Sequence, residues 1–415
     1  MNGRKFYIEV MLAWRNVWKN KRRTVLTLLT IMMGCSMIMF FRATQDGSYE
    51  AMIEDSIAAN TGHIQVHEKG FWENMSISYA FRPEGPVVSY INSSPDVLAS
   101  TKRVHAAGLA SYGNNTFIAV VQGVDPEKEK LVSTLHETIL PGGRYLAADD
   151  GKHIVIGATL AKNLGVKVGD TVAMISQGFD GSIAAANLAV VGIFKTLNPR
   201  YDQSMMVMPL ATAIETFTMM DYISSIAVRL KSTADMERVR DELRALPEKQ
   251  KLEIMGWDEL TPELIQAIVM DKFSGYVFFL ILLLITAFGV LNTVQMSVFE
   301  RTREIGIMMA IGTRPGQIVR LVLFESIFIS LIGVALGIIL GASISYYFFI
   351  HPFDFSAYQK EMEVFAQVTT VFPAKLTWAN VVVTSLLTFL FGVLFSILPA
   401  RRASKLNPIK AIRQL

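Results

Sequence analysis

Four long stretches of the chain are apolar and nearly free of charge: residues 24–41, 273–299, 321–350 and 379–398. Each is long enough to cross the hydrocarbon core of a bilayer as an α-helix, which takes ~20 residues with a lower limit of about 17. The third stretch contains one charged residue, Glu325, near its start. The pattern predicts an α-helical membrane protein with four transmembrane helices, one N-terminal and three C-terminal.

The first stretch has a second interpretation, as a cleaved signal peptide. Small residues precede the cleavage site of such a peptide, whereas Phe40, Phe41 and Arg42 stand at that place here. We therefore interpret residues 24–41 as an uncleaved membrane anchor.

Residues 42–272 alternate between short β-rich runs and polar segments typical of surface helices. A helix is predicted at 232–246, because Ser232 is a capping residue and Pro247 ends the pattern. We expect a large mixed α/β domain of two lobes, one made from 42–105 and 203–272 and the other, 106–202, inserted between them. Strands are predicted at 63–67, 117–124, 153–156, 171–176, 188–194 and 224–230.

The charges beside the apolar stretches predict the orientation of the chain. Seven basic residues stand in residues 1–23 and five follow Leu398, and the 300–320 loop carries four arginines. The 351–378 loop has two lysines and three acids. Because basic flanks stay in the cytoplasm, both termini and the 300–320 loop are expected inside, and 42–272 and 351–378 outside.

The segment before the first apolar stretch has helical periodicity. Tyr7, Met11, Trp14 and Trp18 recur at helical spacing, and basic residues such as Arg15 occupy other faces. Aromatic rings with a polar group favour the boundary between lipid and water. Residues 1–23 are therefore predicted to form an interfacial helix on the cytoplasmic membrane surface.

Composition narrows the classes of function. Of the 415 residues 51% are hydrophobic and 18% are charged, the net charge is +3, and Cys35 is the single cysteine. An intrachain disulfide is impossible, and the charge balance gives no indication of nucleic-acid binding. No phosphate-binding G-x-x-x-x-G-K-[ST], nucleophile elbow or H-E-x-x-H is present. We expect a non-catalytic membrane subunit without a cofactor or metal of its own.

Two sets of side chains in the 42–272 segment have competing interpretations. His63 and His67 would share one face of a strand but lie ~13 Å apart, so we interpret them as surface histidines rather than metal ligands. A local methionine enrichment indicates core packing, or else an adaptable apolar surface for a lipid or partner. Its members are Met205, Met206, Met208, Met219 and Met220.

The third apolar stretch carries two further signals. Gly333, Gly337 and Gly341 are four apart, a spacing that lets membrane helices approach closely. Glu325 is an ionisable residue at the cytoplasmic end of this stretch. We expect it to pair with a nearby arginine such as Arg320, or to hydrogen-bond at the interface.

Residues 299–312 read F-E-R-T-R-E-I-G-I-M-M-A-I-G, alternating charges followed by apolar residues. This segment resembles the coupling helix of the MacB/FtsX-type ABC transporter permeases. Residues 13–24 resemble the N-terminal segment of that family, and 399–408 resemble its C-terminal signature. The order of one span, a large outside domain and three spans also matches. Residues 62–67, 169–171 and 177–181 are more similar to the LolC/LolE lipoprotein-release branch.

The resemblance implies that residues 42–105 and 203–272 form a porter lobe and residues 106–202 a sabre lobe. It also implies that a separate chain supplies the ATPase. Two copies of a partner ABC ATPase would bind ATP and Mg²⁺ and push residues 299–312, and a second permease, identical or paralogous, would complete the unit in a bacterial inner membrane. The cargo would be lipoprotein or another lipidated molecule leaving the outer leaflet, with a periplasmic carrier or adaptor as a further partner. The residues implied in coupling are Glu300, Arg301, Thr302, Arg303, Glu304, Ile305, Gly306, Ile307 and Gly312.

An apolar cavity between the first and second spans of the two permeases would receive acyl chains. Its predicted lining is Met33, Met37, Phe40, Tyr276 and Phe279. Two other functions stay open: an FtsX-like device that activates a periplasmic cell-wall hydrolase, and MacB-like periplasmic efflux. The size of the outer domain disfavours the first, and the lack of an ATPase in these 415 residues disfavours the second.

Overall fold

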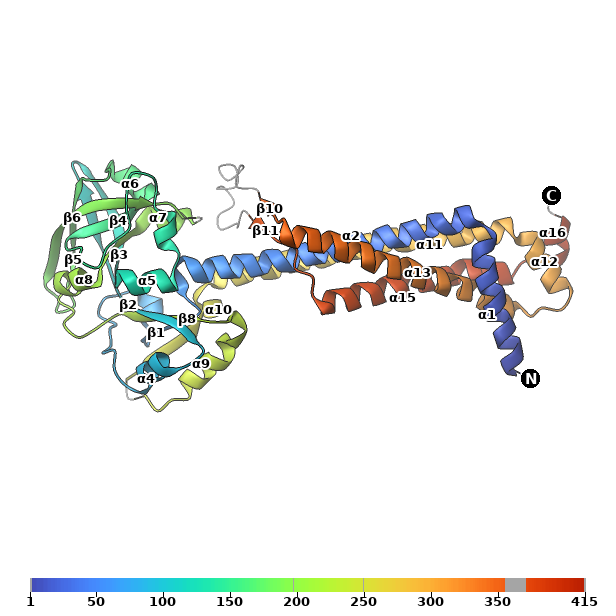
Figure 1. The fold of residues 1–415 in the computed structure, drawn as a ribbon, viewed down its shortest axis with the longest axis horizontal. Coiled ribbons are helices and arrows are strands. Elements are labelled where there is room, and N and C mark those ends of the chain that lie inside the picture. Colours follow the sequence, from blue (N-terminus) through green and yellow to red (C-terminus); the bar gives the residue numbers. More distant parts are fainter. Residues whose placement is uncertain (1, 197, 249, 355–370, 414–415) are drawn as a thin grey trace. The chain divides into compact units, whose positions relative to one another are not determined.

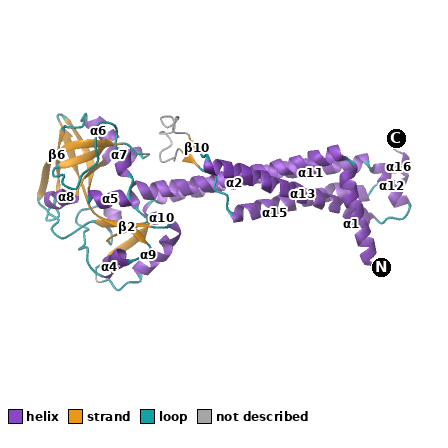
Figure 2. Cartoon of the chain, in the orientation of Figure 1, coloured by secondary structure: helices purple, strands orange, loops and turns teal. Residues whose placement is uncertain are grey.

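The computed structural model describes residues 2–196, 198–248, 250–354 and 371–413. The chain divides into two compact units. A helical unit comprises Met1–Ala51, Ala267–Phe355 and Thr370–Leu415, and an α/β unit comprises Met52–Gln266. Figure 2 shows that the first unit is mainly helical and that most strands lie in the second.

Four long helices form the core of the helical unit. Within the described residues, four helices are long and apolar enough to cross a membrane, which confirms the predicted arrangement of one N-terminal and three C-terminal spans. The helices extend beyond the apolar stretches, because a helix continues wherever its backbone stays hydrogen-bonded. They are α2 (Lys21–Ser56), α11 (Pro262–Glu300), α13 (Pro315–Ile350) and α15 (Trp378–Ser404).

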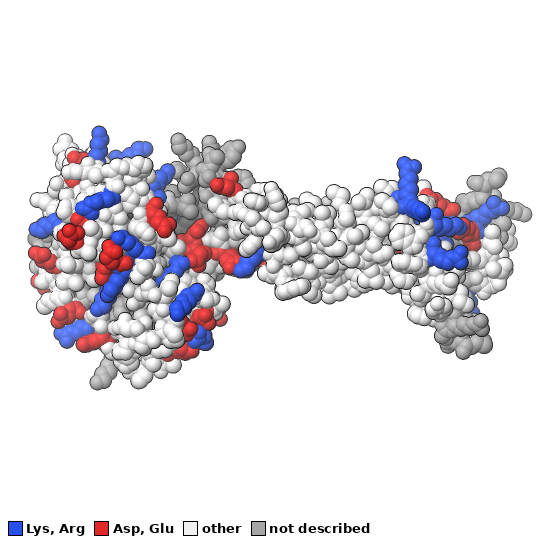
Figure 3. Space-filling model, viewed as in Figure 1, with Lys and Arg blue, Asp and Glu red and all other residues white. Residues whose placement is uncertain are grey.

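Three short helices, α1 (Asn2–Lys19), α12 (Thr302–Ala310) and α16 (Pro408–Arg413), lie at one end of this bundle (Figure 1). Lys and Arg side chains gather at the same end, and the visible face of the middle of the bundle carries no charge (Figure 3). We call this the charged end. Charged groups are costly inside hydrocarbon, so this distribution fits a membrane-spanning bundle.

Small residues allow the long helices to touch. A Cβ added at Gly333 would come within 2.8 Å of the Ile31 side chain, and one at Gly337 within 2.7 Å of the Cβ of Cys35. One at Gly341 would come within 3.1 Å of Ser36. The three glycines thus lie on the face of α13 that contacts α2, where a larger side chain would separate the two backbones.

The 351–378 loop is described at its two ends only. Phe353–Asp354 (β10) pairs antiparallel with Val371–Phe372 (β11), and residues 355–370 lie outside the described residues. Gly47 of α2 approaches the loop so closely that an added Cβ would meet the carbonyl oxygen of Pro373. The Lys375 ammonium bonds the Glu50 carboxylate at 2.5 Å. The loop therefore packs on the first long helix.

The described strands of the α/β unit form one nine-stranded sheet in the order β3-β7-β4-β6-β5-β2-β8-β1-β9. An additional β3–β2 pairing closes β2, β3, β7, β4, β6 and β5 into a barrel. The remaining strands, β8, β1 and β9, extend an antiparallel sheet from the first half of β2. The bounds are β1 Ile64–Glu68, β2 Val97–Tyr112, β3 Asn115–Val124, β4 His153–Gly157, β5 Thr171–Gln177, β6 Ile183–Phe194, β7 Met205–Pro209, β8 Ser225–Leu230 and β9 Leu252–Gly256.

Short helices complete both lobes. The predicted helix at 232–246 is present as a 3-10 turn and α9, and the Ser232 hydroxyl accepts the backbone N–H of Ala234. A π-helical turn, η1 (Ile57–Thr61), directly follows α2. The remaining helices are α3 Phe71–Asn74, α4 Pro86–Ser93, α5 Pro126–Val132, η2 Leu135–Thr138, α6 Ala158–Leu164, α7 Pro199–Ser204, α8 Leu210–Thr216, η3 Thr233–Asp235, α9 Met236–Arg244 and α10 Trp257–Leu260.

The lobe boundary needs a correction. The sequence assigned residues from 203 onward to the lobe with the chain ends, but β7 lies inside the barrel, parallel to β3 and antiparallel to β4. All five residues of β7 are buried, so this strand needs a central position with both faces covered. In addition, β2 runs through both lobes instead of ending near residue 105.

The methionine enrichment belongs mainly to the core. Met205, Met206, Met208 and Met219 are buried, and Met220 is 63% exposed. Met206 and Met208 fill the barrel together with the apolar side chains of α6 and α8. The packing interpretation therefore accounts for four of the five residues.

The histidines are buried, not on the surface as predicted. The imidazole of His63 accepts the Leu230 backbone N–H and contacts the Thr233 hydroxyl. The His67 ring stacks on Trp72 and, among the described residues, has no hydrogen-bond partner. Desolvation lowers the pKa of His63 and His67 to about 4 and that of His105 to about 3. Each ring is therefore neutral in the folded domain at neutral pH.

The histidines predict how the stability of the α/β unit depends on pH. The unfolded chain takes up protons on histidine near pH 6.5, whereas the folded chain does so only near pH 4. The unfolded state thus binds more protons in this window, and stability falls as the pH drops from about 6.5 to 4. His67→Leu should flatten this dependence, and His351→Leu, at an exposed ring, should not. The measurement is the denaturant midpoint of the full chain in detergent at several pH values, with proteolysis of residues 52–266 as the readout of unfolding. If the midpoint of His67→Leu depends on pH as steeply as that of the unmodified chain, the prediction is wrong.

Candidate coupling site

The short helix α12 has one packed face and one open face. Thr302, Ile305 and Gly306 are buried against the bundle, and α12 also packs on α16. On the open side Arg303 is exposed, Ile307 is 46% exposed, and Ile311, just after the helix, is 79% exposed. Exposed apolar side chains beside a charged one are typical of a surface that receives a partner.

The turn after α12 depends on a glycine. Gly312 has φ +99°, a left-handed conformation that other residues rarely adopt. Its N–H donates to the Met309 carbonyl, and the Thr313 N–H donates to that of Met308. These bonds end α12 and lead the chain into α13.

Glu325 forms the centre of a polar cluster. Its side chain is 9% exposed, and its Oε1 accepts hydrogen bonds from Arg301 Nη1 at 2.8 Å and Asn16 Nδ2 at 2.6 Å. Glu325 thus pairs with an arginine, as predicted, but the partner is Arg301 rather than Arg320. Arg320 instead bonds both carboxylate oxygens of Glu9 at 2.9 Å. Five helical positions separate Arg320 from Glu325, which places the two side chains on different faces of α13.

Two further carboxylates tie α1 and α2 to the same region. The Lys19 ammonium bonds Glu304 Oε1 at 2.5 Å, and Arg301 Nε bonds Glu304 Oε2 at 3.1 Å. The bond with Lys19 makes the largest contribution to lowering the pKa of the Glu304 carboxyl, and the bond with Arg301 lowers it further. Asn20 and Arg23 donate to the Glu300 carboxylate. The start of α12 is thus held by α1, α2 and α13 through hydrogen bonds to charged groups.

Of the nine residues implied in coupling, the structure brings Glu300, Arg301 and Glu304 into this cluster. Thr302, Ile305 and Gly306 form the buried face of α12, and Arg303 and Ile307 lie on its open face. Sequence reasoning missed Glu9, Asn16 and Lys19. A signal was available. Asn16, Lys19 and Arg23 are polar residues three and four apart just before the first apolar stretch, and Glu325 is the single charged residue of the third apolar stretch.

The five residues predicted to line an acyl cavity between two permeases differ in their exposure within this chain. Met33 and Met37 are exposed on α2. Tyr276 is exposed on α11, and the Arg42 guanidinium lies over its ring at 5.3 Å. Phe40 instead packs on Phe348 of α13, and Phe279 is half-buried.

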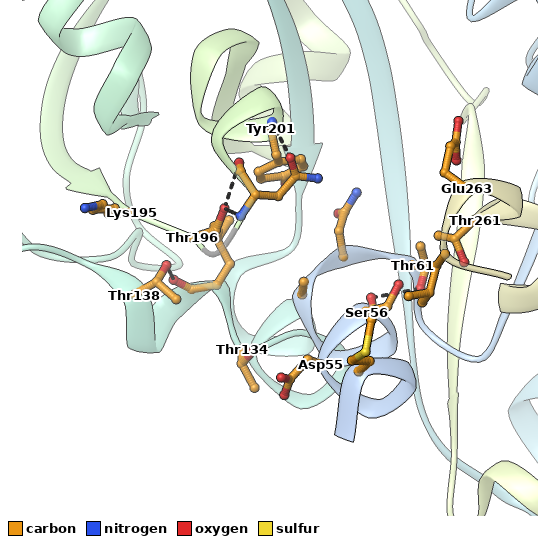
Figure 4. Close-up of a pocket in the computed structure, with 16 residues that line it drawn as sticks. Asp55, Ser56, Thr61, Thr134, Thr138, Lys195, Thr196, Tyr201, Thr261 and Glu263 are labelled. Carbon is orange, nitrogen blue, oxygen red and sulfur yellow. Dashed lines mark hydrogen bonds between the residues drawn. The ribbon is translucent and has the colours of Figure 1, made fainter. Parts of the chain in front are cut away.

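A cavity of about 390 Å³ lies within the α/β unit (Figure 4). Ligand pockets measure roughly 300–1,000 Å³, so its size suits a small molecule or a short chain segment. Hydroxyl and amide groups line it together with apolar side chains. Its walls come from the end of α2 and η1 (Met52, Asp55, Ser56, Ala59, Asn60, Thr61), from Thr134, Leu135 and Thr138, from Lys195, Thr196, Asn198 and Tyr201, and from Thr261, Glu263 and Leu264.

A buried ion pair supports one wall of this cavity. Arg103 and Glu129 are at most 2% exposed and bond through two contacts, at 2.5 and 3.1 Å. Arg103 also donates to the Asn60 carbonyl of η1. The pair therefore fixes the π-helical turn to the barrel. No local pattern in the sequence predicts the cavity, because four separated segments build it.

No metal site accompanies these features in the described part of the chain. No group of three or more His, Cys, Asp or Glu residues there is arranged to hold an ion. The arrangement at the charged end instead suits mechanical work: a short helix with an open face, held to several long helices at its start. Together with the four long apolar helices, these features define the class of membrane permeases.

Comparison with known proteins agrees with that class. Residues 24–246 match the MacB-like periplasmic core domain, and residues 276–408 match the FtsX-like permease C-terminal family. The chain belongs to the MacB/FtsX-type family of permeases. Its LolC/LolE-branch resemblance rests on the sequence motifs alone.

Curated relatives include macrolide export ATP-binding/permease proteins MacB. That of Neisseria gonorrhoeae is 26% identical over 411 residues, covering 96% of this chain and 59% of the relative. A MacB of Yersinia pestis is 24% identical over 419 residues, covering 98% and 61%. The chain therefore spans about three fifths of the length of these relatives.

Two solved structures are also similar. The periplasmic region of MacB from Actinobacillus actinomycetemcomitans is 21% identical with a TM-score of 0.34, covering 50% of this chain and 94% of that one. The extracellular domain of the transporter YknZ from Gram-positive bacteria is 16% identical with a TM-score of 0.35, covering 47% and 100%.

Removing the charge of Glu325 should loosen α12. Glu325→Gln removes the buried carboxylate that the largely buried Arg301 guanidinium bonds and leaves the more exposed Glu304 as its one remaining anion. This loss costs about 1–3 kcal/mol locally. Backbone amide exchange in Thr302–Ala310 should then accelerate by about tenfold or more. Arg303→Gln, on the open face of the same helix, serves as the matched control. Equal exchange in the two variants would show that Glu325 does not hold α12.

Proposed function

We propose that this chain is the membrane subunit of an ABC transporter and that α12 receives force from an ATPase. The observation that carries the proposal is the construction of α12: its open face carries Arg303, Ile307 and Ile311, and its start is bonded to α1, α2 and α13. A push on the open face would therefore move several helices together. Family membership supports the same role.

The ATPase would act from outside these 415 residues, which contain no phosphate-binding loop. We place it on a partner chain, in two copies that bind ATP and Mg²⁺, together with a second permease. The abundance of arginine and lysine at the charged end supports a cytoplasmic location for α12 and both termini. The α/β unit would then lie in the periplasm and the bundle in the inner membrane.

For the cargo, we propose lipoprotein or another lipidated molecule leaving the outer leaflet. The support is the branch resemblance of the motifs at 62–67, 169–171 and 177–181, and the exposed apolar side chains Met33, Met37 and Tyr276 on α2 and α11. MacB-like efflux is the second candidate, because the curated relatives are macrolide exporters. The 390 Å³ cavity would be a contact site for either cargo.

Gentle purification of the full chain followed by mass spectrometry tests the proposal. We expect a co-purifying ABC ATPase together with acylated proteins. Ile307→Asp combined with Ile311→Asp should reduce the recovered ATPase by about tenfold, since a buried apolar contact would be replaced by unpaired charge. Met220→Asp, at an exposed apolar residue of the α/β unit, is the control.

The other outcomes separate the alternatives. An ATPase recovered with a cell-wall hydrolase and no acylated protein would favour the regulatory function. Recovery of an adaptor and a small amphipathic molecule would favour efflux. If no ATPase is recovered with the unmodified chain, the coupling role of α12 is wrong.

A further inference from the structure

The helix α1 presents two different faces. Glu9, Ala13 and Val17 are buried, and α1 packs on α13 through this side. A second face, which borders this contact, exposes a row of large side chains. Its members are Tyr7 (69% exposed), Met11 (50%), Trp14 (44%) and Trp18 (44%).

The position of α1 identifies the surroundings of this row. One residue, Asn20, separates α1 from α2, and the apolar stretch of α2 begins at Thr24. Figure 1 shows that α1 runs across the long helices rather than along them. A helix that crosses a spanning bundle where its apolar stretch begins lies at the level of the lipid headgroups.

Contacts with α13 place the aromatic row at the edge of the hydrocarbon. The Trp14 ring meets the Phe328 ring edge-on at 5.3 Å, and Phe6 meets Phe324 at 5.4 Å. Phe324 and Phe328 belong to the apolar stretch of α13. Trp14 and Trp18 also contact each other, at 5.9 Å. Tryptophan prefers this depth, where its ring meets acyl chains and its N–H meets water.

Unpaired basic residues flank the row. Arg15, Lys21 and Arg22 are exposed, and no carboxylate of the described residues lies within ion-pair distance of them. Lys19 projects from the same short stretch, is 61% exposed and bonds Glu304. Anions are the ligands that four neighbouring cations attract, and at this depth the anions available in quantity are phospholipid headgroups.

We propose that the open face of α1 binds anionic phospholipids and that this binding weakens the Lys19–Glu304 bond that holds α12. An anionic headgroup competes with the Glu304 carboxylate for the Lys19 ammonium. Lipid composition would thereby set how firmly the coupling helix is attached. This relay rests on the proposed coupling role of α12, whereas the lipid site itself does not.

Tryptophan quenching tests the site in the full chain. In nanodiscs, a variant with Trp72, Trp257 and Trp378 replaced by Phe retains fluorescence from Trp14 and Trp18 of α1. Brominated phosphatidylglycerol should quench this emission at a lower mole fraction than brominated phosphatidylcholine. Each basic residue should raise the local concentration of the anionic lipid over the neutral one by about fivefold. Equal quenching by the two lipids overturns the site.

Matched charge removals locate the site. Arg15→Gln, Lys21→Gln and Arg22→Gln together should abolish the preference. Arg401→Gln, Lys405→Gln and Lys410→Gln remove the same charge from exposed residues of the C-terminal segment and should preserve it. If both triple variants lose the preference equally, the binding is nonspecific attraction to the charged end and the proposal fails.

Amide exchange tests the relay without ATPase or nucleotide. Exchange in α12 should be faster in discs of equal parts phosphatidylcholine and phosphatidylglycerol than in phosphatidylcholine alone. Lys19→Gln should show the faster rate in both. A lipid preference without any change in α12 would overturn the relay. Failure to recover an ATPase in the purification above would reject the coupling role instead, so the two failures are distinguishable.

Discussion

The carboxylate of Glu325 is the group on which the charged end of the bundle depends. An ionised side chain at the start of an apolar helix is stable only if neighbouring groups replace the water that it loses. Asn16 of α1 and Arg301 at the start of α12 supply those groups. Helices α1, α12 and α13, which are remote in sequence, therefore meet at Glu325. Separating α12 from α13 would break the largely buried Arg301–Glu325 ion pair.

Close packing of the long helices makes this meeting point possible. Gly333, Gly337 and Gly341 let α13 touch α2 along several turns, and the junction of α1 and α2 is thereby held beside the start of α13. In the other direction α11 runs without a break from Pro262 to Glu300. Its first turn contributes Glu263 and Leu264 to the lining of the 390 Å³ cavity.

The sequence predicted most of the architecture because membrane constraints act locally. The hydrophobic stretches identify the four long helices, and β-rich runs identify most strands, since each depends on neighbours within a few residues. The barrel closure was not predictable in the same way. The pairing of β2 with β3, β5 and β8 joins residues far apart in the chain, and no local pattern specifies the partner of a strand.

The candidate site was predicted in part for the same reason. The segment around Glu304 is recognisable because its alternating charges and apolar residues are contiguous. Its partners were not, because Lys19 and Asn16 approach it only after α1 folds back onto the bundle. Histidine burial was missed as well: the alternation of residues 63–67 indicates a strand, but β1 lies between β8 and β9 with both faces covered.

The ion pairs that hold the start of α12 differ in burial. Glu325 lies where water is largely excluded, so its bond to Arg301 is expensive to break. Lys19 and Glu304 are 61% and 46% exposed, and an exposed ion pair contributes ~1 kcal/mol or less. The start of α12 is therefore held by two kinds of bond, a buried one to Glu325 and a weaker, exposed one to Lys19. In the proposed coupling role, the exposed bond would break before the buried one when the open face of α12 is pushed.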